Sequence, residues 1–276
     1  MRAGLVASAV LPSLLLVTAG VHPASAAACL FEPQGEGRVA AVTDARGFRL
    51  EDGREIRLAG IEPASSAAGG KDRAAAQKDR TAALAAIVAG REVTLRGQDD
   101  APDRYGRQVA FVYLAGSETA VQNELLRQGE ALVSADIADK DCAAALFTAE
   151  AEARQAKRGT WADASVIKNA ESPDDILTGI GRFTVVEGKV LSVRQAGATT
   201  YLNFGRNWTR DFAVTISRRM MPAVEAAGLS VKSLENKKIR VRGVVEARGG
   251  PRIEVLRVGQ IEVSGRELAC GTRAYP

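Results

Sequence analysis

The stretch GRVAAVTDARGFRLEDGREIRLAGI, residues 37–61, alternates apolar and polar residues along most of its length. The alternation is interrupted twice, at Arg46-Gly47 and at Asp52-Gly53, where glycine follows a polar residue as in tight turns. A period of two residues is typical of a strand with one buried face. The stretch therefore predicts three strands joined by two tight turns.

The segments that follow extend this pattern into a mixed fold. Residues 71–90 are rich in alanine and end in Gly90, which predicts a helix with a C-terminal glycine. Residues 91–97 and 108–116 have strand patterns, and residues 120–129 and 142–159 have helix patterns. The predicted order is three strands, a helix, two strands and two helices.

Residues 182–264 repeat part of this order. Strands are predicted at 182–195, at 199–204 and, after a turn at 205–207, at 208–216; a short helix at 221–229 and strands at 237–248 and 252–263 follow. Three strands, a helix and two strands make the order of a five-stranded OB-type barrel. The fold prediction is α+β, mainly β, with two tandem five-stranded OB-type barrels, the first carrying additional helices.

The domain boundaries follow from these patterns and from one polar stretch without a sustained period. The predicted parts are a signal peptide (1–26), a first barrel domain (35–163), a linker (164–181), a basic C-terminal barrel domain (182–264) and a tail (265–276).

The first 26 residues have the features of a secretory signal peptide. Arg2 precedes an apolar run, residues 5–20, and Ala-Ser-Ala at 24–26 fits the small-x-small cleavage pattern. A membrane anchor is the alternative, although the run is short for a span and contains Pro12. A lipoprotein site at Cys29 is a second alternative. The prediction is a secreted or periplasmic protein that is not held in a membrane after cleavage.

Cleavage at this point would remove His22, which is the only histidine of the chain. A mature chain without histidine excludes a Ser-His-Asp triad, a histidine general base and a histidine-ligated zinc ion. Any acid–base or metal chemistry must then use carboxylates, with arginine or lysine supplying positive charge.

Three cysteines remain, Cys29, Cys142 and Cys270, and in an oxidising compartment two of them are expected to pair. Of the three possible pairings we favour Cys29–Cys142, which would tie the mature N-terminus to a helix of the first domain. Three unpaired thiols are the alternative, and Cys270 has no assignment.

Charge divides the chain into unlike halves. Residues 27–181 contain 19 Lys and Arg against 25 Asp and Glu, whereas residues 182–264 contain 15 against 7. The first half is therefore acidic and the second basic. If the protein binds a polyanion, long-range electrostatics direct that ligand to the second half.

Three motifs give the first domain a family resemblance. The Tyr-Gly-Arg run at 105–107 with its following strand, the NELLRQG helix at 123–129, and the closing helix that ends in Gly-Thr-Trp at 159–161 occur in this order after IRLAGIEP at 56–63. In this arrangement the segment resembles the thermonuclease, or staphylococcal-nuclease-like, family over most of residues 37–163.

The resemblance implies two arginines that grip the scissile phosphate. One precedes the apolar run of the third strand and falls on Arg57, and the other ends the Tyr-Gly-Arg run and falls on Arg107. Arginine suits this role because a guanidinium group contacts phosphate in a bidentate manner and stabilises charge in the transition state. The alternative for each is a surface arginine in an ion pair.

The resemblance also implies a calcium ion held by two carboxylates, and here the sequence departs from the family. The second carboxylate falls on Glu62, but the first falls on Arg46, a reversal of charge; Asp44 lies two residues earlier as a substitute. The general base of the family falls on Ser65, whose hydroxyl cannot take a proton from water near neutral pH. Losing a base costs about 10²–10⁴ in rate, and losing the metal costs more.

The second predicted barrel suggests a different chemistry. Tyr201, Arg206, Trp208 and Arg210 interleave aromatic and basic side chains along its second and third strands. That is the usual face of an OB barrel for single-stranded nucleic acid, where aromatic side chains stack on bases and arginines contact phosphates. The alternative is that the aromatic side chains fill the small barrel, which we prefer for Phe204 and Phe212.

Three functions follow. The first is a protein that acts on or binds DNA or RNA with a degraded calcium and base site, so that Arg57, Glu62 and Arg107 support little or no hydrolysis. The second is an active metal-dependent endonuclease with a rearranged carboxylate site, using Asp44, Glu62 and one of Asp99, Asp100 and Asp103. The third is a non-catalytic periplasmic module that binds an unidentified protein.

Overall fold

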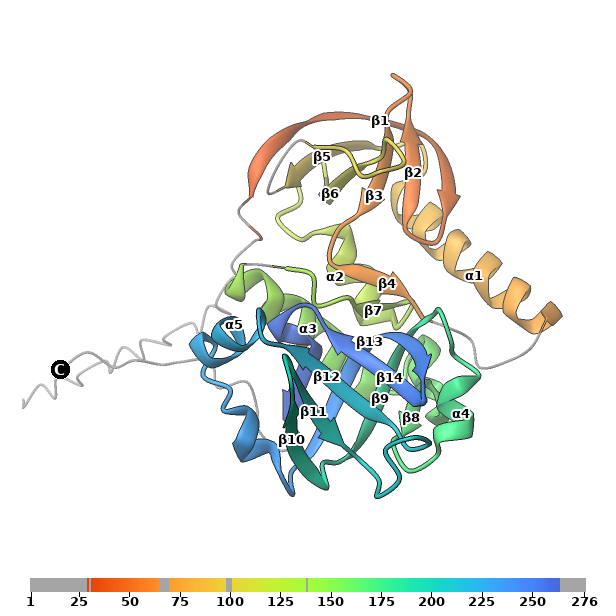
Figure 1. The fold of residues 1–276 in the computed structure, drawn as a ribbon. Coiled ribbons are helices and arrows are strands. Elements are labelled where there is room, and N and C mark those ends of the chain that lie inside the picture. The colour runs from red at the N-terminus through yellow and green to blue at the C-terminus, as the bar shows by residue number, and fades with distance from the viewer. Residues whose placement is uncertain (1–28, 30, 65–69, 98–100, 138, 264–276) are drawn as a thin grey trace, which may run out of the picture.

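The structure is a computed structural model that describes residues 29, 31–64, 70–97, 101–137 and 139–263 (Figure 1). The predicted signal peptide, Ser65, Asp99, Asp100 and Cys270 lie outside the described residues. The described chain is a mixed α+β fold, mainly β, whose strands fall into one closed barrel, one larger sheet and one two-stranded sheet.

Five strands of the N-terminal half close into a barrel. They are β1 (Glu32–Asp44), β2 (Gly47–Leu50), β3 (Glu55–Leu58), β5 (Glu92–Gly97) and β6 (Gln108–Leu114). Their order around the barrel is β1-β2-β3-β6-β5. The 13-residue strand β1 closes it, because its first half pairs with β5 and its second half with β2. A closed five-stranded barrel fits the predicted OB-type fold.

The alternation read from residues 37–61 becomes the inner and outer faces of this barrel. Phe48, Leu50, Ile56 and Leu58 are almost completely buried, whereas Arg57, between two of them, is only half-buried. Successive side chains of a strand point to opposite faces, so the apolar positions fill the core and the polar ones meet solvent. The prediction of three strands joined by tight turns is confirmed.

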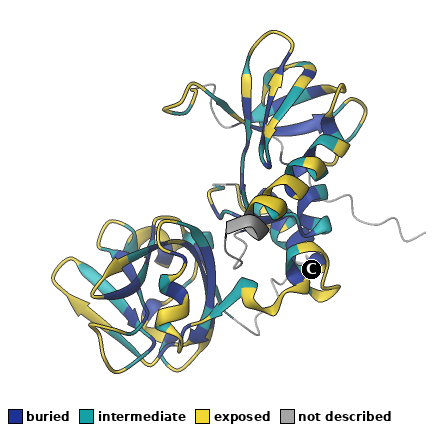
Figure 2. Cartoon of the chain, turned by 90° about the vertical axis from the view of Figure 1, so that its right-hand side faces the viewer, coloured by how far each residue is buried: buried dark blue, intermediate teal, exposed yellow. Residues whose placement is uncertain are grey.

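Three helices and two short strands complete this half. They are α1 (Gly70–Val88), α2 (Val121–Gln128), α3 (Lys140–Gln155), β4 (Ile61–Pro63) and β7 (Ala131–Val133). β4 and β7 pair with each other below the barrel, next to α2 and α3 (Figure 1). The long helix α1 leaves much of its surface exposed (Figure 2).

A disulfide bond ties the first described residue of the chain to α3. Cys29 and Cys142 are bonded, with their Cα atoms 4.7 Å apart. Asp139 caps α3 by accepting a hydrogen bond from the backbone N–H of Cys142 at 2.7 Å, which fixes the first turn that carries this cysteine. The predicted Cys29–Cys142 pairing is confirmed.

The C-terminal half is built on an eight-stranded sheet. Its strands are β8 (Ile167–Asn169), β9 (Phe183–Lys189), β10 (Ser192–Ala196), β11 (Thr199–Asn203), β12 (Ala213–Ser217), β13 (Lys238–Arg248), β14 (Gly250–Val255) and β15 (Ile261–Val263). The order is β10-β11-β12-β14-β13-β9-β8, and β15 pairs with β13. Two short helices, α4 (Pro173–Leu177) and α5 (Met221–Ala226), pack beside it.

A second closed barrel is not confirmed, because the hydrogen-bond pairing of this sheet does not close. The single strand predicted at 182–195 is divided at Val190 and Leu191 into β9 and β10. β9 pairs with β13, whereas β10 pairs with β11, so the two halves lie at different places in the sheet. The predicted linker, residues 164–181, is also not irregular throughout. It contains the helix α4 and the strand β8, which pairs with β9 in parallel.

A buried ion pair joins the two halves. The Arg242 guanidinium on β13 is fully buried and donates to Glu150 on α3 through Nη1 at 2.8 Å and Nη2 at 3.1 Å. It also ion-pairs with Glu262 on β15 and donates to the backbone carbonyl of Val133 on β7 at 2.9 Å. The aromatic ring of Phe147 lies 4.7 Å from this guanidinium. Every charge in the group therefore has a partner, as burial requires.

Within the described part of the chain, none of the helices has the length and apolar character needed to cross a membrane.

We predict that Arg242→Met lowers the free energy of unfolding by about 3–5 kcal/mol, because it leaves the buried carboxylate of Glu150 without its cation. The measurement is urea denaturation followed by circular dichroism. Arg248→Met is the matched control: its side chain is 72% exposed, and the change should cost less than about 0.5 kcal/mol.

The double variant Arg242→Met/Glu150→Gln should recover part of the loss, because glutamine is uncharged and still accepts the hydrogen bond that Val133 N–H donates to Glu150 at 2.7 Å. An unchanged urea midpoint in Arg242→Met would show that the ion pair does not hold the two halves together.

Candidate phosphate site at the end of the barrel

The strand register places Asp44 and Arg57 in one row on the outside of the barrel. Asp44 on β1 pairs with Gly47 on β2, Gly47 with Arg57 on β3, and Arg57 with Val109 on β6. Directly paired residues point to the same face of a sheet. Arg107 precedes Val109 by two positions and so belongs to the same face. The hydrogen bond with Asp103 raises the pKa of Arg107, and the negative charge of Asp44 adds a smaller effect in the same direction.

Glu62 reaches this row through a tight turn. Gly60 has a φ of 74°, and a side chain there would press against Ile137, so glycine is required where the chain leaves the barrel. Directly after the turn, β4 pairs with β7 and places Glu62 opposite Leu132. The Glu62 carboxylate lies 3.8 Å from the Arg57 guanidinium, between Oε1 and Nη2. The structure therefore brings the two predicted residues together.

Arg46 contacts both carboxylates of the predicted metal site, Glu62 through its guanidinium and Asp44 through its backbone. Its Nη1 forms an ion pair with Glu62 Oε1 and donates to the backbone carbonyl of Ile61 at 3.3 Å. Its backbone N–H donates to Asp44 Oδ1 at 2.8 Å. The side chain is only 18% exposed. The positive charge of Arg46 thus pairs with Glu62, while its backbone N–H occupies one oxygen of Asp44.

The environment of Glu62 acts on its pKa in opposite directions. Burial raises the pKa, the charge of Arg46 and its hydrogen bond lower it, and the charges of Asp136 and Asp44 raise it again. The net effect is a pKa above its ordinary value of 4.5. Burial outweighs the ion pair because water is excluded from the carboxylate.

Arg107 is held by a compact loop. Asp103 Oδ2 accepts hydrogen bonds from Arg107 Nε at 3.0 Å and Nη2 at 2.7 Å, and Asp103 Oδ1 accepts from the backbone N–H groups of Tyr105 and Arg107. The hydrogen bond to Arg107 lowers the pKa of Asp103. Asp103 therefore positions Arg107.

Two further residues lie near this site and were missed in the sequence. Tyr105 is 64% exposed and lies between the guanidinium groups of Arg104 and Arg107, at 4.8 and 5.0 Å from its ring centre. Asp136 follows β7 and ion-pairs at 2.7 Å with Arg257 of the C-terminal half. Tyr105 had a signal, its place in the Tyr-Gly-Arg run. Asp136 and Arg257 had none, because 121 residues separate them.

The barrel and this arrangement of charges agree with a comparison of the sequence with known families. Residues 55–163 match the model of the family described as staphylococcal nuclease homologue. The chain carries a staphylococcal nuclease homologue domain. The match includes Arg57, Glu62 and Arg107 and begins within β3, so Asp44 and Arg46 precede it. No curated protein matches the chain.

Domains of this nuclease family are typically calcium-dependent, and the residues here do not fit that ion. Calcium takes six to eight oxygen ligands, with carboxylates prominent among them. In the described residues no group of three or more Asp, Glu, His or Cys side chains comes together in a way that could hold a metal ion. Asp44 and Glu62 are near one another, but Arg46 is bonded to both. A second cation would face direct repulsion from this guanidinium.

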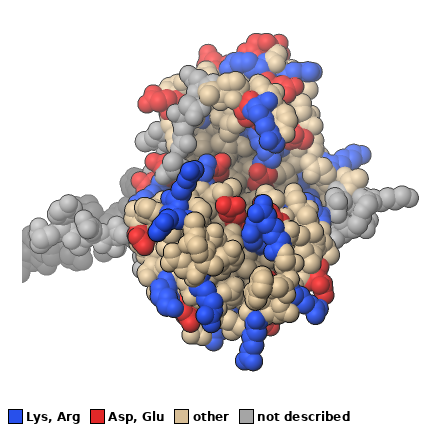
Figure 3. All heavy atoms as spheres, viewed as in Figure 1, with Lys and Arg blue, Asp and Glu red and all other residues tan. Residues whose placement is uncertain are grey.

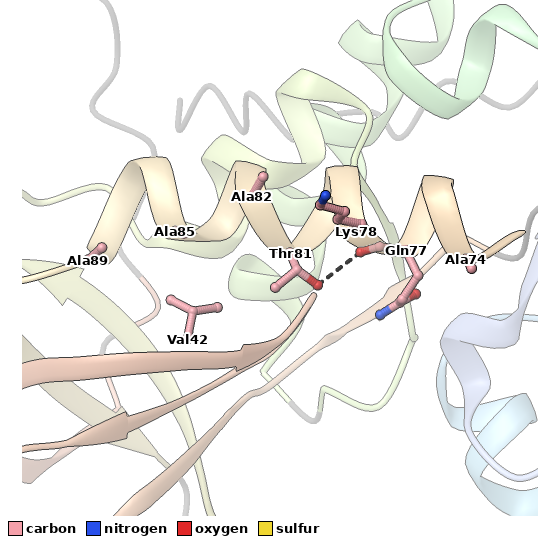
Figure 4. A pocket seen from close by; sticks show the side chains of 8 residues that line it. All are labelled: Val42, Ala74, Gln77, Lys78, Thr81, Ala82, Ala85 and Ala89. Carbon is pink, nitrogen blue, oxygen red and sulfur yellow. Dashed lines mark hydrogen bonds between the residues drawn. The ribbon is translucent and has the colours of Figure 1, made fainter. Parts of the chain in front are cut away.

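A groove elsewhere on the barrel half is not this site. It has a volume of about 660 Å³ and lies between α1 and β1, as the close view in Figure 4 shows. It is lined by Val42, Ala74, Gln77, Lys78, Thr81, Ala82, Ala85 and Ala89. Lys78 is its one charged lining residue, so the groove offers little to a phosphate, and none of the predicted site residues lines it.

The four residues predicted to bind nucleic acid belong to the C-terminal half, and the structure corrects part of their setting. Tyr201 lies on β11 as expected. The strand predicted at 208–216 begins only at Ala213. Arg206, Trp208 and Arg210 therefore all lie in the loop between β11 and β12, and not in a tight turn with a strand directly after it. The prediction that Trp208 and Arg210 lie on the third strand of this half is therefore wrong. Phe204 and Phe212 are buried, as preferred from the sequence.

We predict that Arg46→Met raises the pKa of Glu62 further above 4.5, because Arg46 is the main influence that lowers it. The measurement is a ¹³C NMR titration of the Glu62 carboxyl, with its signal assigned from Glu62→Gln. Because the folded-state pKa is raised, the folded protein holds the proton more tightly than the unfolded chain. Stability therefore falls as pH rises from 4.5 through the raised pKa.

The decrease in stability with rising pH that Glu62 causes should be steeper and extend to higher pH in Arg46→Met than in the wild type. It should be absent in Glu62→Gln. A titration curve for Glu62 that Arg46→Met leaves unchanged would show that the ion pair is not formed in solution.

Proposed function

We propose that this protein binds nucleic acid through the phosphate groups that Arg57 and Arg107 contact, and that it does not hydrolyse phosphodiesters by the calcium-dependent route of its family. The observation that carries the proposal is the ion pair between Arg46 and Glu62. By resemblance, Arg46 stands where the family has a carboxylate that binds the metal ion. Its positive charge still favours a phosphate ligand, but the metal ion that would activate hydrolysis loses a ligand.

The arginines that remain are suited to binding. Arg57 is 21% exposed and Arg107 is 23% exposed, so each is partly shielded from water and still open to a ligand. A bound phosphate would accept a direct charged hydrogen bond from Arg57, in place of the long contact of 3.8 Å between Arg57 and Glu62. Tyr105, exposed beside Arg107, adds an aromatic surface against which a sugar or base could lie.

Catalysis lacks a free base in this arrangement. Glu62 is the nearest carboxylate to Arg57, but the cations of Arg46 and Arg57 both face it. By resemblance, the base position of the family falls on Ser65, which has no carboxylate. Losing the general base and the metal together removes most of the rate that the family mechanism supplies.

The C-terminal half supports the same function through its charge. Its 15 basic residues against 7 acidic ones attract a polyanion at long range. We propose that this half is an OB-type barrel in which the first strand is broken. If β9 and β10 are taken as two parts of one strand, the order β10-β11-β12-β14-β13-β9 repeats β1-β2-β3-β6-β5-β1.

The test uses labelled single- and double-stranded DNA and RNA with calcium or with a chelator, and reads anisotropy and cleavage in the same tubes. We expect binding without calcium-dependent cleavage. Arg57→Ala and Arg107→Ala should each weaken binding and reduce the slope of log K against log[salt] by about 0.7–0.9, the value for one phosphate contact. Arg38→Ala, an exposed arginine on β1, is the control and should change neither.

Each other outcome identifies a different function. Calcium-dependent cleavage that is lost in Arg107→Ala would overturn the proposal in favour of an endonuclease with a rearranged carboxylate site. Absence of both binding and cleavage would overturn it in favour of a module that binds another protein.

We further propose that the protein is secreted or periplasmic and that residues 1–26 are removed. The apolar run at 5–20, the Ala-Ser-Ala motif and the Cys29–Cys142 disulfide bond support this, because such bonds persist in oxidising compartments. Expression in a secreting bacterial host followed by N-terminal sequencing should give a chain that begins at Ala27. A chain that retains residues 1–26 in the cytoplasmic fraction would contradict the proposal.

A further inference from the structure

The loop between β11 and β12 lies in a strongly basic part of the chain. Residues 192–219 contain five arginines and a single acidic residue, Asp211. The family match ends at residue 163 and gives this region no role. Figure 3 shows Lys and Arg side chains spread around a largely uncharged surface of the C-terminal half.

Hydrogen bonds within the loop hold its backbone in one conformation. Asn207 Oδ1 accepts from the backbone N–H of Thr209 at 3.1 Å and from its hydroxyl at 2.6 Å. Asp211 Oδ2 accepts from the backbone N–H of Asn207 at 2.7 Å, so the acidic residue is used inside the loop. Gly205 is required here, since a side chain would overlap the Asp211 carboxylate.

Both ends of the loop are anchored in the core. Phe204 and Phe212 are 5% and 1% exposed, and their ring centres are 5.0 Å apart. The turn between β13 and β14 supports the loop from the side, because Gly250 lies against the backbone of Arg210 and Asp211. The loop therefore holds its shape without a partner, which reduces the conformational entropy that binding would cost.

This rigid loop presents Trp208 to solvent. Trp208 is 78% exposed, whereas Trp161, the other tryptophan of the chain, is 6% exposed. Arg206 and Arg210 lie on either side of it in the sequence, and the Arg210 side chain is 68% exposed. Its one ion pair, with Asp174 at 3.5 Å, is between two exposed groups and so contributes little.

The outer face of the neighbouring strands continues the same chemistry. The register places Arg194 on β10 beside Tyr201 on β11, and Tyr201 beside Thr215 on β12, which is only 3% exposed. The residues of the next row on this face are Ser192, Asn203 and Ala213. The buried side chains of these strands, Leu202, Val214 and Ile216, point the other way, into the core.

We propose that this loop and the outer face of β10, β11 and β12 bind an unpaired segment of nucleic acid, with Trp208 stacking on a base and Arg206 and Arg210 contacting phosphates. The base faces that an indole can stack on are free only in an unpaired strand. Five arginines against one internally bonded carboxylate complement a polyanion. The inference rests on the proposed function, which it extends from phosphate contact at the barrel to base contact at a second site.

The test uses the intrinsic fluorescence of Trp208. An unpaired DNA oligonucleotide should quench the emission of the wild type, and an abasic oligonucleotide of the same length should quench it much less. In Trp208→Phe only the buried Trp161 emits, and its emission should not respond. Trp208→Ala should weaken binding of the oligonucleotide by about fivefold to 150-fold, the range expected for one stacked base.

Two matched controls separate a local effect from a general one. Leu256→Ala removes an exposed side chain, 57% exposed, elsewhere in the same half and should leave binding unchanged. Arg206→Ala/Arg210→Ala should weaken binding more than Arg38→Ala/Arg91→Ala, which removes the same charge from exposed positions on the barrel.

The outcomes distinguish this inference from the proposed function. Binding that depends on Trp208 but not on Arg57 and Arg107 supports the second site and overturns the first. Binding that depends on Arg57 and Arg107, with no quenching and no effect of Trp208→Ala, overturns the second site alone. Equal quenching by the abasic strand would show that Trp208 senses phosphate binding nearby and does not stack on a base, which overturns the inference.

Discussion

The fold depends most on the burial of one guanidinium group. Arg242 has no exposed surface, and burial alone would lower its pKa, but Glu150 and Glu262 raise it beyond its ordinary value. Arg242 therefore stays positively charged, and the three elements that supply its partners, α3, β7 and β15, must remain packed around it. Through Glu150 and Val133 it holds β7, which pairs with β4 and so fixes the strand that carries Glu62. The C-terminal half thus contributes to the geometry of a site in the N-terminal half.

Two arginines that are far apart in the sequence have comparable roles. Arg242 neutralises carboxylates between the two halves, and Arg46 neutralises Glu62 at the end of the barrel. In each case a permanent positive charge stands beside a buried or half-buried carboxylate. At the barrel this ion pair is the basis of the proposal that the site binds phosphate without hydrolysing it.

Local patterns predicted much of the fold. The alternation of residues 37–61, with glycine at its turns, gave the strands of the barrel, and Gly90 and Gly129 marked ends of helices. The same reasoning was wrong where a local sequence pattern is compatible with two different structures. Residues 182–195 alternate as one strand does, yet the chain is divided at Val190 and Leu191 into two strands. Trp208 was assigned to a strand that in the structure begins only at Ala213.

The site was only partly predictable for a related reason. Arg57, Glu62 and Arg107 were found because each stands at a definite place in a local motif. The partner of Arg107, Asp103, is four residues away, and the position of Arg46 beside Glu62 required the register of β1, β2 and β3. Pairs such as Asp136 with Arg257 have no sequence signal at all, since nothing in either segment specifies the other.

The sequence by itself determined the barrel strands and the helices of the first half, the division of charge, and the presence of arginine at position 46. These depend on residue type and short-range spacing, which the chain carries directly. Only the tertiary structure decided where the Arg46 guanidinium points, that Trp208 is exposed while Phe204 and Phe212 are buried, and that Arg242 joins the two halves. Those outcomes depend on which distant groups share one low-dielectric space, and that is set by packing of the whole chain.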